Sequence, residues 1–254
     1  MNNNKQIITL GRRIMNCYGK YKVIIALEIL TRYSSMNRVL FKVRIVPGTT
    51  ISSLMSYARE VKISLGIPYF VIALQDNSIY LLVSTTNTRK VNLTDMLQAE
   101  GIDEVTRQLK LPIAVGVDIF MQLDYEDLAD LKHTAYTGST GSGKSVGLQC
   151  LIMSLASFRS PEEVNFIIID VGGGSLGRFE GLPHLSCPVI KDTLMGIFAL
   201  ENLVGEINRR LTLSDEELDK LPAIVCVFDE FTSFIDPSNN GLSNKCKGLI
   251  NDIL

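Results

Sequence analysis

The sequence predicts an α/β protein with two regions: a small α+β domain over residues 1–123, then a domain with a mainly parallel sheet over residues 124–254. Two continuous apolar runs, residues 164–169 and 223–228, are typical of strands buried on both faces of a parallel sheet. A long amphipathic helical pattern separates these runs, which gives the strand–helix–strand order of such sheets. The first region instead mixes short strand and helix patterns.

Composition and charge limit the possible classes. The chain has 254 residues, of which 46% are hydrophobic and 20% charged, so it predicts a folded protein with a substantial core. A net charge of −2 gives no general electrostatic support for a nucleic-acid partner. The most apolar run near the start is interrupted by Glu28, and the first residues lack the apolar segment of a signal peptide. The five scattered cysteines form no C-x-x-C pair, which favours reduced thiols and a cytoplasmic location.

In the first region, hydrophobic periodicity and turn residues set the expected elements. Alternating apolar residues predict a strand that ends at Pro47-Gly48, and Asp76-Asn77 indicate a hairpin turn. Thr50 or Ser52 is suited to cap a helix. The expected elements are a helix over 5–33, a strand over 38–46, a helix over 50–65, strands over 69–74 and 78–83, and a strand over 113–119.

The second region contains the βαβ pattern. A helix over residues 192–211 carries apolar residues at the spacing of one buried stripe, and residues 214–217 have the spacing of a capping box. The remaining expected elements are a helix over 146–156 and the two strands over 164–169 and 223–228. Ligand chemistry is expected at the carboxyl ends of the parallel strands.

One segment matches the phosphate-binding loop G-x-x-x-x-G-K-[ST] at every fixed position. Its glycines allow a tight turn whose N–H groups face a phosphate chain. Lys144 is expected to contact the β- and γ-phosphates, and the Ser145 hydroxyl to bind Mg²⁺. The residues expected to bind ATP are Gly138, Ser139, Thr140, Gly141, Ser142, Gly143, Lys144, Ser145 and Val146.

The flanks of this loop carry part of the prediction. Residues 134–137 are expected to form a strand before it and residues 146–156 a helix after it, which places the phosphates at a positive helix N-terminus. The alternative is a Gly/Ser-rich surface turn without a ligand.

A phosphate-binding loop needs an acid at the end of a nearby strand to hold Mg²⁺. Asp170 and Asp229 both follow apolar runs, so position alone does not separate them. Glu230 favours Asp229, because an adjacent pair of acids provides one carboxylate for the metal and one general base. We therefore expect Asp229 to bind Mg²⁺ and Glu230, with Lys144, to be catalytic. The role of Asp170 stays open: it is either a turn residue or a second acid near the metal site.

These residues together resemble the FtsK/SpoIIIE family of DNA-translocating ATPases. The resemblance is most specific from Gly138 through Leu155, the Walker A segment, and from Leu221 through Phe231, the Walker B segment. It extends to Ser160–Asp170, Glu180–Leu185 and Glu206–Arg210. A looser resemblance, to the small domain that precedes the motor, is found in the residues from Val43 onward.

The resemblance implies a RecA-like P-loop motor in the bacterial cytoplasm that assembles into a ring around double-stranded DNA. It implies coupling of ATP hydrolysis to DNA movement in chromosome segregation or conjugative transfer. The family often has Pro-Lys after the acid that aligns with Asp170, where this chain has Val171-Gly172. The chain ends soon after the expected Walker B strand, so we expect a C-terminally incomplete motor that hydrolyses ATP slowly by itself.

Two other functions stay open from sequence alone. Related motors drive protein export in type VII secretion, although membrane spans and tandem motor domains are typical of those proteins. A nucleotide-binding fragment without motor activity also fits the early end of the chain. Basic residues such as Arg89, Lys90, Lys245 and Lys247 are dispersed, and their spacing favours a solvated surface over a DNA-binding patch.

Overall fold

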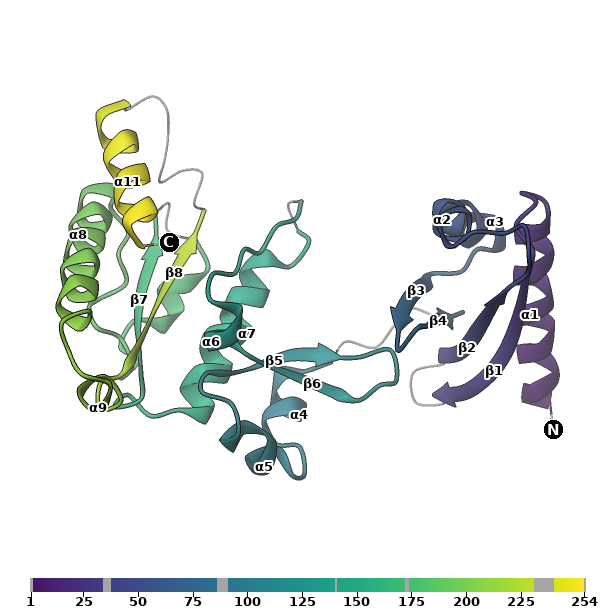
Figure 1. The fold of residues 1–254 in the computed structure, drawn as a ribbon, viewed down its shortest axis with the longest axis horizontal. Coiled ribbons are helices and arrows are strands. Elements are labelled where there is room, and N and C mark those ends of the chain that lie inside the picture. Colours follow the sequence, from purple (N-terminus) through teal and green to yellow (C-terminus); the bar gives the residue numbers. More distant parts are fainter. Residues whose placement is uncertain are drawn as a thin grey trace. The chain divides into compact units, whose positions relative to one another are not determined.

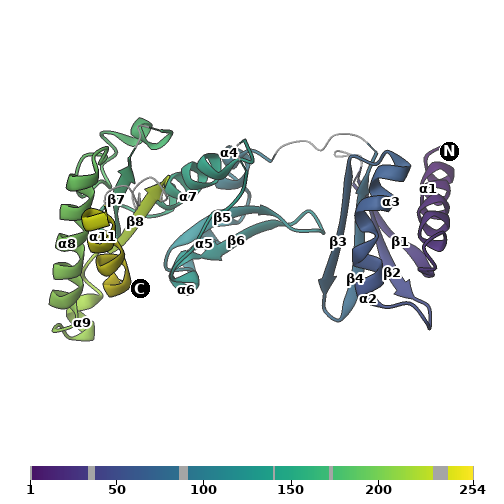
Figure 2. The ribbon, with the colours of Figure 1, turned by 90° about the horizontal axis from the view of Figure 1, so that it is seen from above.

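The computed structural model describes residues 2–33, 38–85, 91–139, 141–171, 174–230 and 240–253. The chain divides into two compact units (Figures 1 and 2). Unit 1 consists of Met1–Asn92 and Val117–Leu123, and unit 2 of Leu93–Gly116 and Asp124–Leu254. These units do not follow a single cut after residue 123, because residues 93–116 group with the second unit and a short hairpin tip groups with the first.

Unit 1 is an antiparallel sheet with helices packed on it. Its four strands lie in the order β1-β2-β4-β3, and all neighbouring strands are antiparallel. Residues from α1, α2 and α3 share one hydrophobic cluster with the strands, centred on Tyr18, Phe41 and Val61. The elements are α1 (Asn2–Gly19), β1 (Ile25–Tyr33), β2 (Arg38–Ile45), α2 (Ile51–Ser56), α3 (Ala58–Leu65), β3 (Tyr69–Gln75) and β4 (Ser78–Ser84).

The single helix expected over residues 5–33 is wrong in its second half. The helix α1 ends at Gly19, and a turn follows in which Lys22 has a φ of 61°. Residues 25–33 then pair with β2 from Ile25 opposite Ile45 to Tyr33 opposite Arg38. Pairing with a long apolar strand overrides the helical spacing of these residues, as tertiary contacts often do for β-branched segments.

Turn residues act in unit 1 much as the sequence predicts. Thr50 caps α2 in a reciprocal capping box with Ser53. The expected helix is interrupted at Tyr57, so that α2 and α3 are separate helices. Asp76 and Asn77 have φ values of 48° and 55°, which suits the tight hairpin turn between β3 and β4.

Unit 2 contains the parallel strands that the sequence predicts. The strands β7 and β8 pair in parallel from Val164 opposite Ala223 to Asp170 opposite Asp229. A hairpin of β5 and β6 forms a separate two-stranded sheet. The elements are α4 (Leu93–Leu97), α5 (Ile102–Arg107), β5 (Pro112–Val117), β6 (Leu123–Asp127), α6 (Leu128–Leu131), α7 (Lys144–Phe158), β7 (Val164–Asp170), the 3₁₀ helix η2 (Leu176–Phe179), α8 (Thr193–Arg210), α9 (Asp215–Leu218), β8 (Ala223–Asp229) and α11 (Asn240–Ile253).

The two faces of the β7–β8 pair are covered by different helices. Phe166 and Ile168 belong to one hydrophobic cluster with residues of α7, whereas Ile167 and Ile169 belong to another with residues of α8 and α11. Because side chains alternate along a strand, α7 and α8 lie on opposite faces of the pair (Figure 1). This layering gives the α/β architecture predicted from the continuous apolar runs.

The strand expected over residues 134–137 is absent from the described structure. Residues 134–139 form no regular secondary structure, and their side chains are exposed. Only Ala135 and Tyr136 are apolar here, too few to bury a strand. Tyr136 instead lies against α7, where a Cβ added to Gly147 would approach its ring to 2.9 Å.

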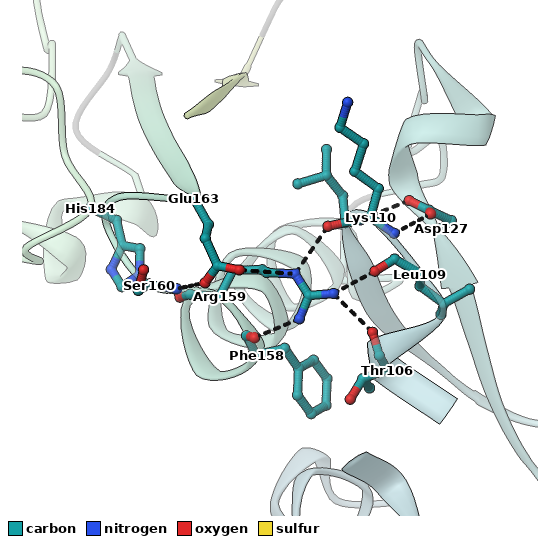
Figure 3. A network of polar contacts seen from close by, with 10 residues as sticks. Thr106, Leu109, Lys110, Asp127, Phe158, Arg159, Ser160, Glu163 and His184 are labelled. Carbon is teal, nitrogen blue, oxygen red and sulfur yellow. Dashed lines mark hydrogen bonds and ion pairs between the residues drawn. The ribbon is translucent and has the colours of Figure 1, made fainter. Parts of the chain in front are cut away.

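A polar network holds the C-terminal end of α7 (Figure 3). The Arg159 guanidinium donates to the carbonyls of Thr106 (2.8 Å), Lys110 (3.1 Å), Phe158 (2.8 Å) and Leu109. Three of these carbonyls lie in the last turn of α5 or shortly after it, where a cation is favourable. Arg159 therefore ties the segment between α5 and β5 to the end of the helix that begins at the phosphate-binding loop.

Two general features bear on the class of protein. All five cysteines are free, as the sequence predicts. Within the described ranges, no helix combines the length and apolarity needed to cross a membrane.

Candidate nucleotide and metal site

The Walker A segment forms the N-terminal entry to α7. Gly141 and Gly143 have φ values of 79° and 101°, in the left-handed region that glycine adopts without strain. The Ser142 N–H donates to the Ser139 carbonyl at 3.0 Å, which closes the turn. A side chain at Gly138 would collide with that of Ser142. Thr140, also predicted to bind nucleotide, lies outside the described residues.

The end of α7 is suited to an anion. Lys144 and Ser145 are its first two residues, both half-buried, and Val146 is 60% exposed. The first-turn N–H groups of a helix lack intrahelical carbonyl partners, and the first turn of α7 contains no acidic residue to neutralise them. Positive-φ glycines, a lysine and an uncompensated helix N-terminus together fit a phosphate chain.

The two candidate metal acids lie side by side at the carboxyl ends of β7 and β8. Asp170 and Asp229 are register partners, and they are 0% and 8% exposed. Asp170 accepts the N–H groups of Gly174 at 3.0 Å and Leu176 at 3.1 Å, one on each oxygen. Both of its oxygens thus hold backbone N–H groups of the segment 174–176.

Asp229 has a different set of donors. Its Oδ2 accepts the Ser175 hydroxyl at 3.0 Å, and its Oδ1 accepts the backbone N–H of Glu230, also at 3.0 Å. Each carboxylate oxygen has two lone pairs, so one acceptor position per oxygen remains on Asp229, as it does on Asp170. The Asp229 carboxylate thus keeps oxygen lone pairs of the kind that Mg²⁺ or its waters bind.

Glu230 is exposed and has a φ of 52°. A residue other than glycine in this region is unusual, and such conformations gather at functional sites. The backbone here turns the Glu230 side chain toward solvent immediately after the buried Asp229. Of these two neighbouring acids, Asp229 is thus buried and Glu230 is exposed.

The described structure does not join the Walker A segment directly to these acids. Among the described residues, no hydrogen bond or ion pair links Gly138–Ser145 to Asp170, Asp229 or Glu230. An indirect connection runs from α7, where the Gln149 side-chain amide donates to the Ser175 carbonyl at 3.2 Å. Sequence reasoning missed Gln149 and Ser175, and the run of glycines after Asp170 was the available signal for a close backbone approach.

Other residues in the resembling segments have structural partners. His184 Nε2 lies 2.8 Å from the Arg159 carbonyl. Glu206 forms ion pairs at 2.7 Å with both Arg209 and Arg210, whose hydrogen bonds lower the pKa of Glu206 to about 2. Both arginines are therefore engaged by α8 itself in this structure.

Comparison with known proteins shows which family the chain resembles. Residues 93–221, about half of the chain, match the FtsK/SpoIIIE family. The DNA translocase FtsK of Haemophilus ducreyi is 39% identical over 136 residues, covering 53% of this chain and 14% of the relative. That of Shewanella oneidensis is 30% identical over 237 residues, covering 77% of this chain and 26% of the relative.

One solved structure shows the fold. It is the pCW3 conjugation coupling protein TcpA, in a monomer form with ATPγS, which has a TM-score of 0.52 and 19% identity. The match covers 96% of this chain and 72% of that chain. The family match begins at residue 93, where unit 2 also begins. Because the family match covers about half of the chain, the chain belongs to the FtsK/SpoIIIE family.

Proposed function

We propose that this chain binds ATP with Mg²⁺ and forms part of an ATP-driven motor that moves double-stranded DNA. The observation that carries the proposal is the entry to α7, where Gly141 and Gly143 adopt positive φ beside Lys144 and the first turn has no acid. Family membership and the name DNA translocase of the relatives support the same activity. The chain spans only 14% to 26% of the length of the relatives described above. The activity of a whole motor is therefore proposed for an assembly of which this chain forms a part.

The proposed roles follow from the positions of the side chains. The segment Gly138–Val146 holds the phosphates through backbone N–H groups and the Lys144 ammonium. Ser145 and Asp229 hold Mg²⁺, and Glu230 accepts the proton of the attacking water as general base. When bound, Mg²⁺ neutralises charge on the phosphate oxygens. Asp170 holds the loop after β7 in place.

DNA as the cargo is proposed from the relatives. Two of them carry the name DNA translocase, and the TcpA structure is that of a conjugation coupling protein solved with ATPγS. We also propose that subunits assemble into a ring in the bacterial cytoplasm, as the family resemblance implies. Such a ring would complete each site with residues from a neighbouring subunit.

Substituting Lys144 by alanine tests the nucleotide site. We expect Lys144→Ala to abolish ATPγS binding measured by calorimetry, because the loop loses its only side-chain cation within Gly138–Ser145. Lys247→Ala, at an exposed position of α11, is the matched control and should bind as the wild type does. Unchanged affinity in Lys144→Ala would rule out the assignment.

Hydrolysis and DNA coupling need a separate measurement. Glu230→Gln should retain ATPγS and lose at least about 10²-fold in hydrolysis rate, since an amide does not accept the proton. Phosphate release with and without duplex DNA tests the cargo: stimulation by DNA supports the motor, and its absence in a chain that hydrolyses ATP argues against DNA.

A further inference from the structure

Three consecutive residues after β7 hold both buried acids. The Gly174 N–H donates to Asp170 Oδ1 at 3.0 Å, and the Leu176 N–H donates to Asp170 Oδ2 at 3.1 Å. Between them, the Ser175 hydroxyl donates to Asp229 Oδ2 at 3.0 Å. We call residues 174–176 the carboxylate clamp.

The clamp meets an electrostatic need of these two strands. Asp170 and Asp229 are adjacent in register and almost fully buried, so neither carboxyl group is well hydrated. Buried carboxylates require hydrogen-bond donors. With the Glu230 N–H, the clamp supplies one donor to each of the four carboxylate oxygens.

Close approach explains why the clamp begins with glycine. A Cβ added to Gly174 would lie 3.0 Å from Asp170 Oδ1 and 3.6 Å from Asp229 Oδ2. The backbone at this position therefore lies against both acids at once. A larger residue would push the segment away from the donors' positions.

The same segment is held from the phosphate side. Gln149 belongs to α7, five positions after Lys144, and its side-chain amide donates to the Ser175 carbonyl at 3.2 Å. Ser175 thus has its hydroxyl on Asp229 and its carbonyl on α7. It connects the helix that begins at the Walker A loop with the acid at the end of β8.

We propose that Ser175 is a positioning residue for the metal site, and that Gln149 sets its position relative to the Walker A helix. The Ser175 hydroxyl fixes one oxygen of Asp229, which leaves the remaining lone pairs directed for Mg²⁺ and its waters. This inference rests on the proposed function, because it assigns Asp229 to the metal that accompanies ATP.

Ser175 is separable from the closure of the loop. The two backbone N–H groups on Asp170 carry that closure, and both remain in Ser175→Ala. The variant removes one hydrogen bond to Asp229 and adds no bulk. Ser175→Thr keeps the hydroxyl and is the conservative partner.

The test is calorimetric titration of ATPγS at increasing Mg²⁺, with a metal-free arm in EDTA. For Ser175→Ala we expect the Mg²⁺ concentration at half-maximal binding to rise about tenfold, the scale of one hydrogen bond to a charged group. Metal-free binding should stay within about twofold of the wild type. Ser175→Thr should restore the wild-type requirement, and Gln149→Leu should shift it in the same direction as Ser175→Ala.

Electron paramagnetic resonance of Mn²⁺ in place of Mg²⁺ gives a second readout that does not depend on turnover. The Mn²⁺ affinity of the nucleotide-bound Ser175→Ala variant should fall by the same factor. Ser186→Ala, at an exposed position near β7, is the matched control. Thermal unfolding of each variant without ligand identifies any variant that fails to fold. If Ser175→Ala fails to fold, Gln149→Leu replaces it in both measurements.

The outcomes separate this inference from the proposed function. If Asp229→Asn raises the Mg²⁺ requirement and Ser175→Ala and Gln149→Leu do not, the positioning role is wrong and the nucleotide site stands. An equal loss in the metal-free and Mg²⁺ arms of Ser175→Ala also overturns the role. If the wild type binds no ATPγS, the proposed function fails, and this inference fails with it.

Discussion

At the scale of single residues, hydrogen-bond donors distinguish two acids that the sequence leaves alike. Asp170 and Asp229 both end a buried parallel strand and face each other in register. Asp170 receives two backbone N–H groups from the following loop, whereas Asp229 receives a hydroxyl and the N–H of its own successor. The first arrangement stabilises a loop, and the second orients a carboxylate while its next residue stays exposed.

Exchange of each acid for its amide tests this division. We expect Asp229→Asn to weaken Mg²⁺ binding and so raise the Mg²⁺ concentration needed for ATPγS binding, with little change in stability. Asp170→Asn should instead lower the free energy of unfolding by about 1–3 kcal/mol, because one oxygen that accepts a backbone N–H becomes a donor. Denaturant unfolding and Mg²⁺ titration measure the two effects, and the opposite pattern would place the metal on Asp170.

A second residue-scale prediction concerns pH. The ion pairs with Arg209 and Arg210 lower the pKa of Glu206 to about 2 from an ordinary value of 4.5. A lowered folded pKa means that the stabilisation is fully present above pH 4.5 and is lost as the pH falls toward 2. The difference in unfolding free energy between the wild type and Glu206→Gln should therefore be constant near neutral pH and shrink through this range. Chemical denaturation at several pH values measures it, with the exposed Glu216→Gln as control; a difference that persists at pH 2 would contradict the assignment.

At the scale of elements, α7 connects the Walker A loop at its N-terminus with the Arg159 network at its C-terminus. It is preceded by the positive-φ Gly143 and followed by Arg159, whose guanidinium donates to four carbonyls (Figure 3). These contacts hold the C-terminal end of α7 against α5 and the segment that follows α5.

Removal of the Arg159 guanidinium should destabilise unit 2. In Arg159→Met the alkyl packing is largely kept, but the carbonyls of buried Thr106 and half-buried Leu109 lose their hydrogen bonds from the guanidinium. We expect a loss of about 2–3 kcal/mol in unfolding free energy. Arg178→Met, at an exposed position, is the control. A change below about 0.5 kcal/mol, typical of an ordinary surface site, would show that water replaces these contacts.

The same scale shows what sequence can predict of the fold. The strands β7 and β8 and the helix α7 are predicted well, because continuous apolar runs and the glycine-lysine motif are local signals. The strand β1 was mistaken for helix, since its pairing with β2 depends on residues far along the chain. A strand over residues 134–137 is predicted only because these residues precede the phosphate-binding loop. Their side chains are exposed in the structure, so they contribute no buried face to a sheet.

For the candidate site, sequence reasoning identifies the motif residues and misses their supports. Gly141, Gly143 and Lys144 follow a fixed spacing, so the motif locates them directly. Gln149 and Ser175 carry no motif of their own and become neighbours only when α7 packs on the β7–β8 pair. Long-range packing, which a local pattern does not encode, determines both.

At the scale of the whole molecule, the two units have separate hydrophobic cores. The cluster of unit 1 is built around Tyr18, Phe41 and Val61, and the clusters of unit 2 lie on the two faces of the β7–β8 pair. The boundary expected after residue 123 differs from this division, because each unit is assembled from two segments of the chain. Such a division leaves no single change of composition in the sequence.

Separate cores predict separable stabilities. Phe41 is 1% exposed within unit 1, so Phe41→Ala should lower the stability of that unit by about 3–5 kcal/mol. Nucleotide affinity, which depends on the loop before α7 in unit 2, should change by less than about twofold. Calorimetric melting with and without ATPγS distinguishes the units: ligand should shift only the transition that Phe41→Ala leaves in place. A parallel fall in ATPγS affinity would show that the cores are coupled.

The hairpin between β5 and β6 has a consequence for how the chain folds during synthesis. Its tip, Val117–Leu123, belongs to unit 1, where Met121 accepts a contact from Arg38 at 3.1 Å and Phe120 lies edge-on to Tyr80 at 5.1 Å. A nascent chain that has only residues 1–92 outside the ribosome therefore lacks part of its first unit. By the time the tip emerges, residues 93–116 of the next unit have already emerged. The first unit is therefore complete only once residue 123 has emerged, after synthesis of the second unit has already begun.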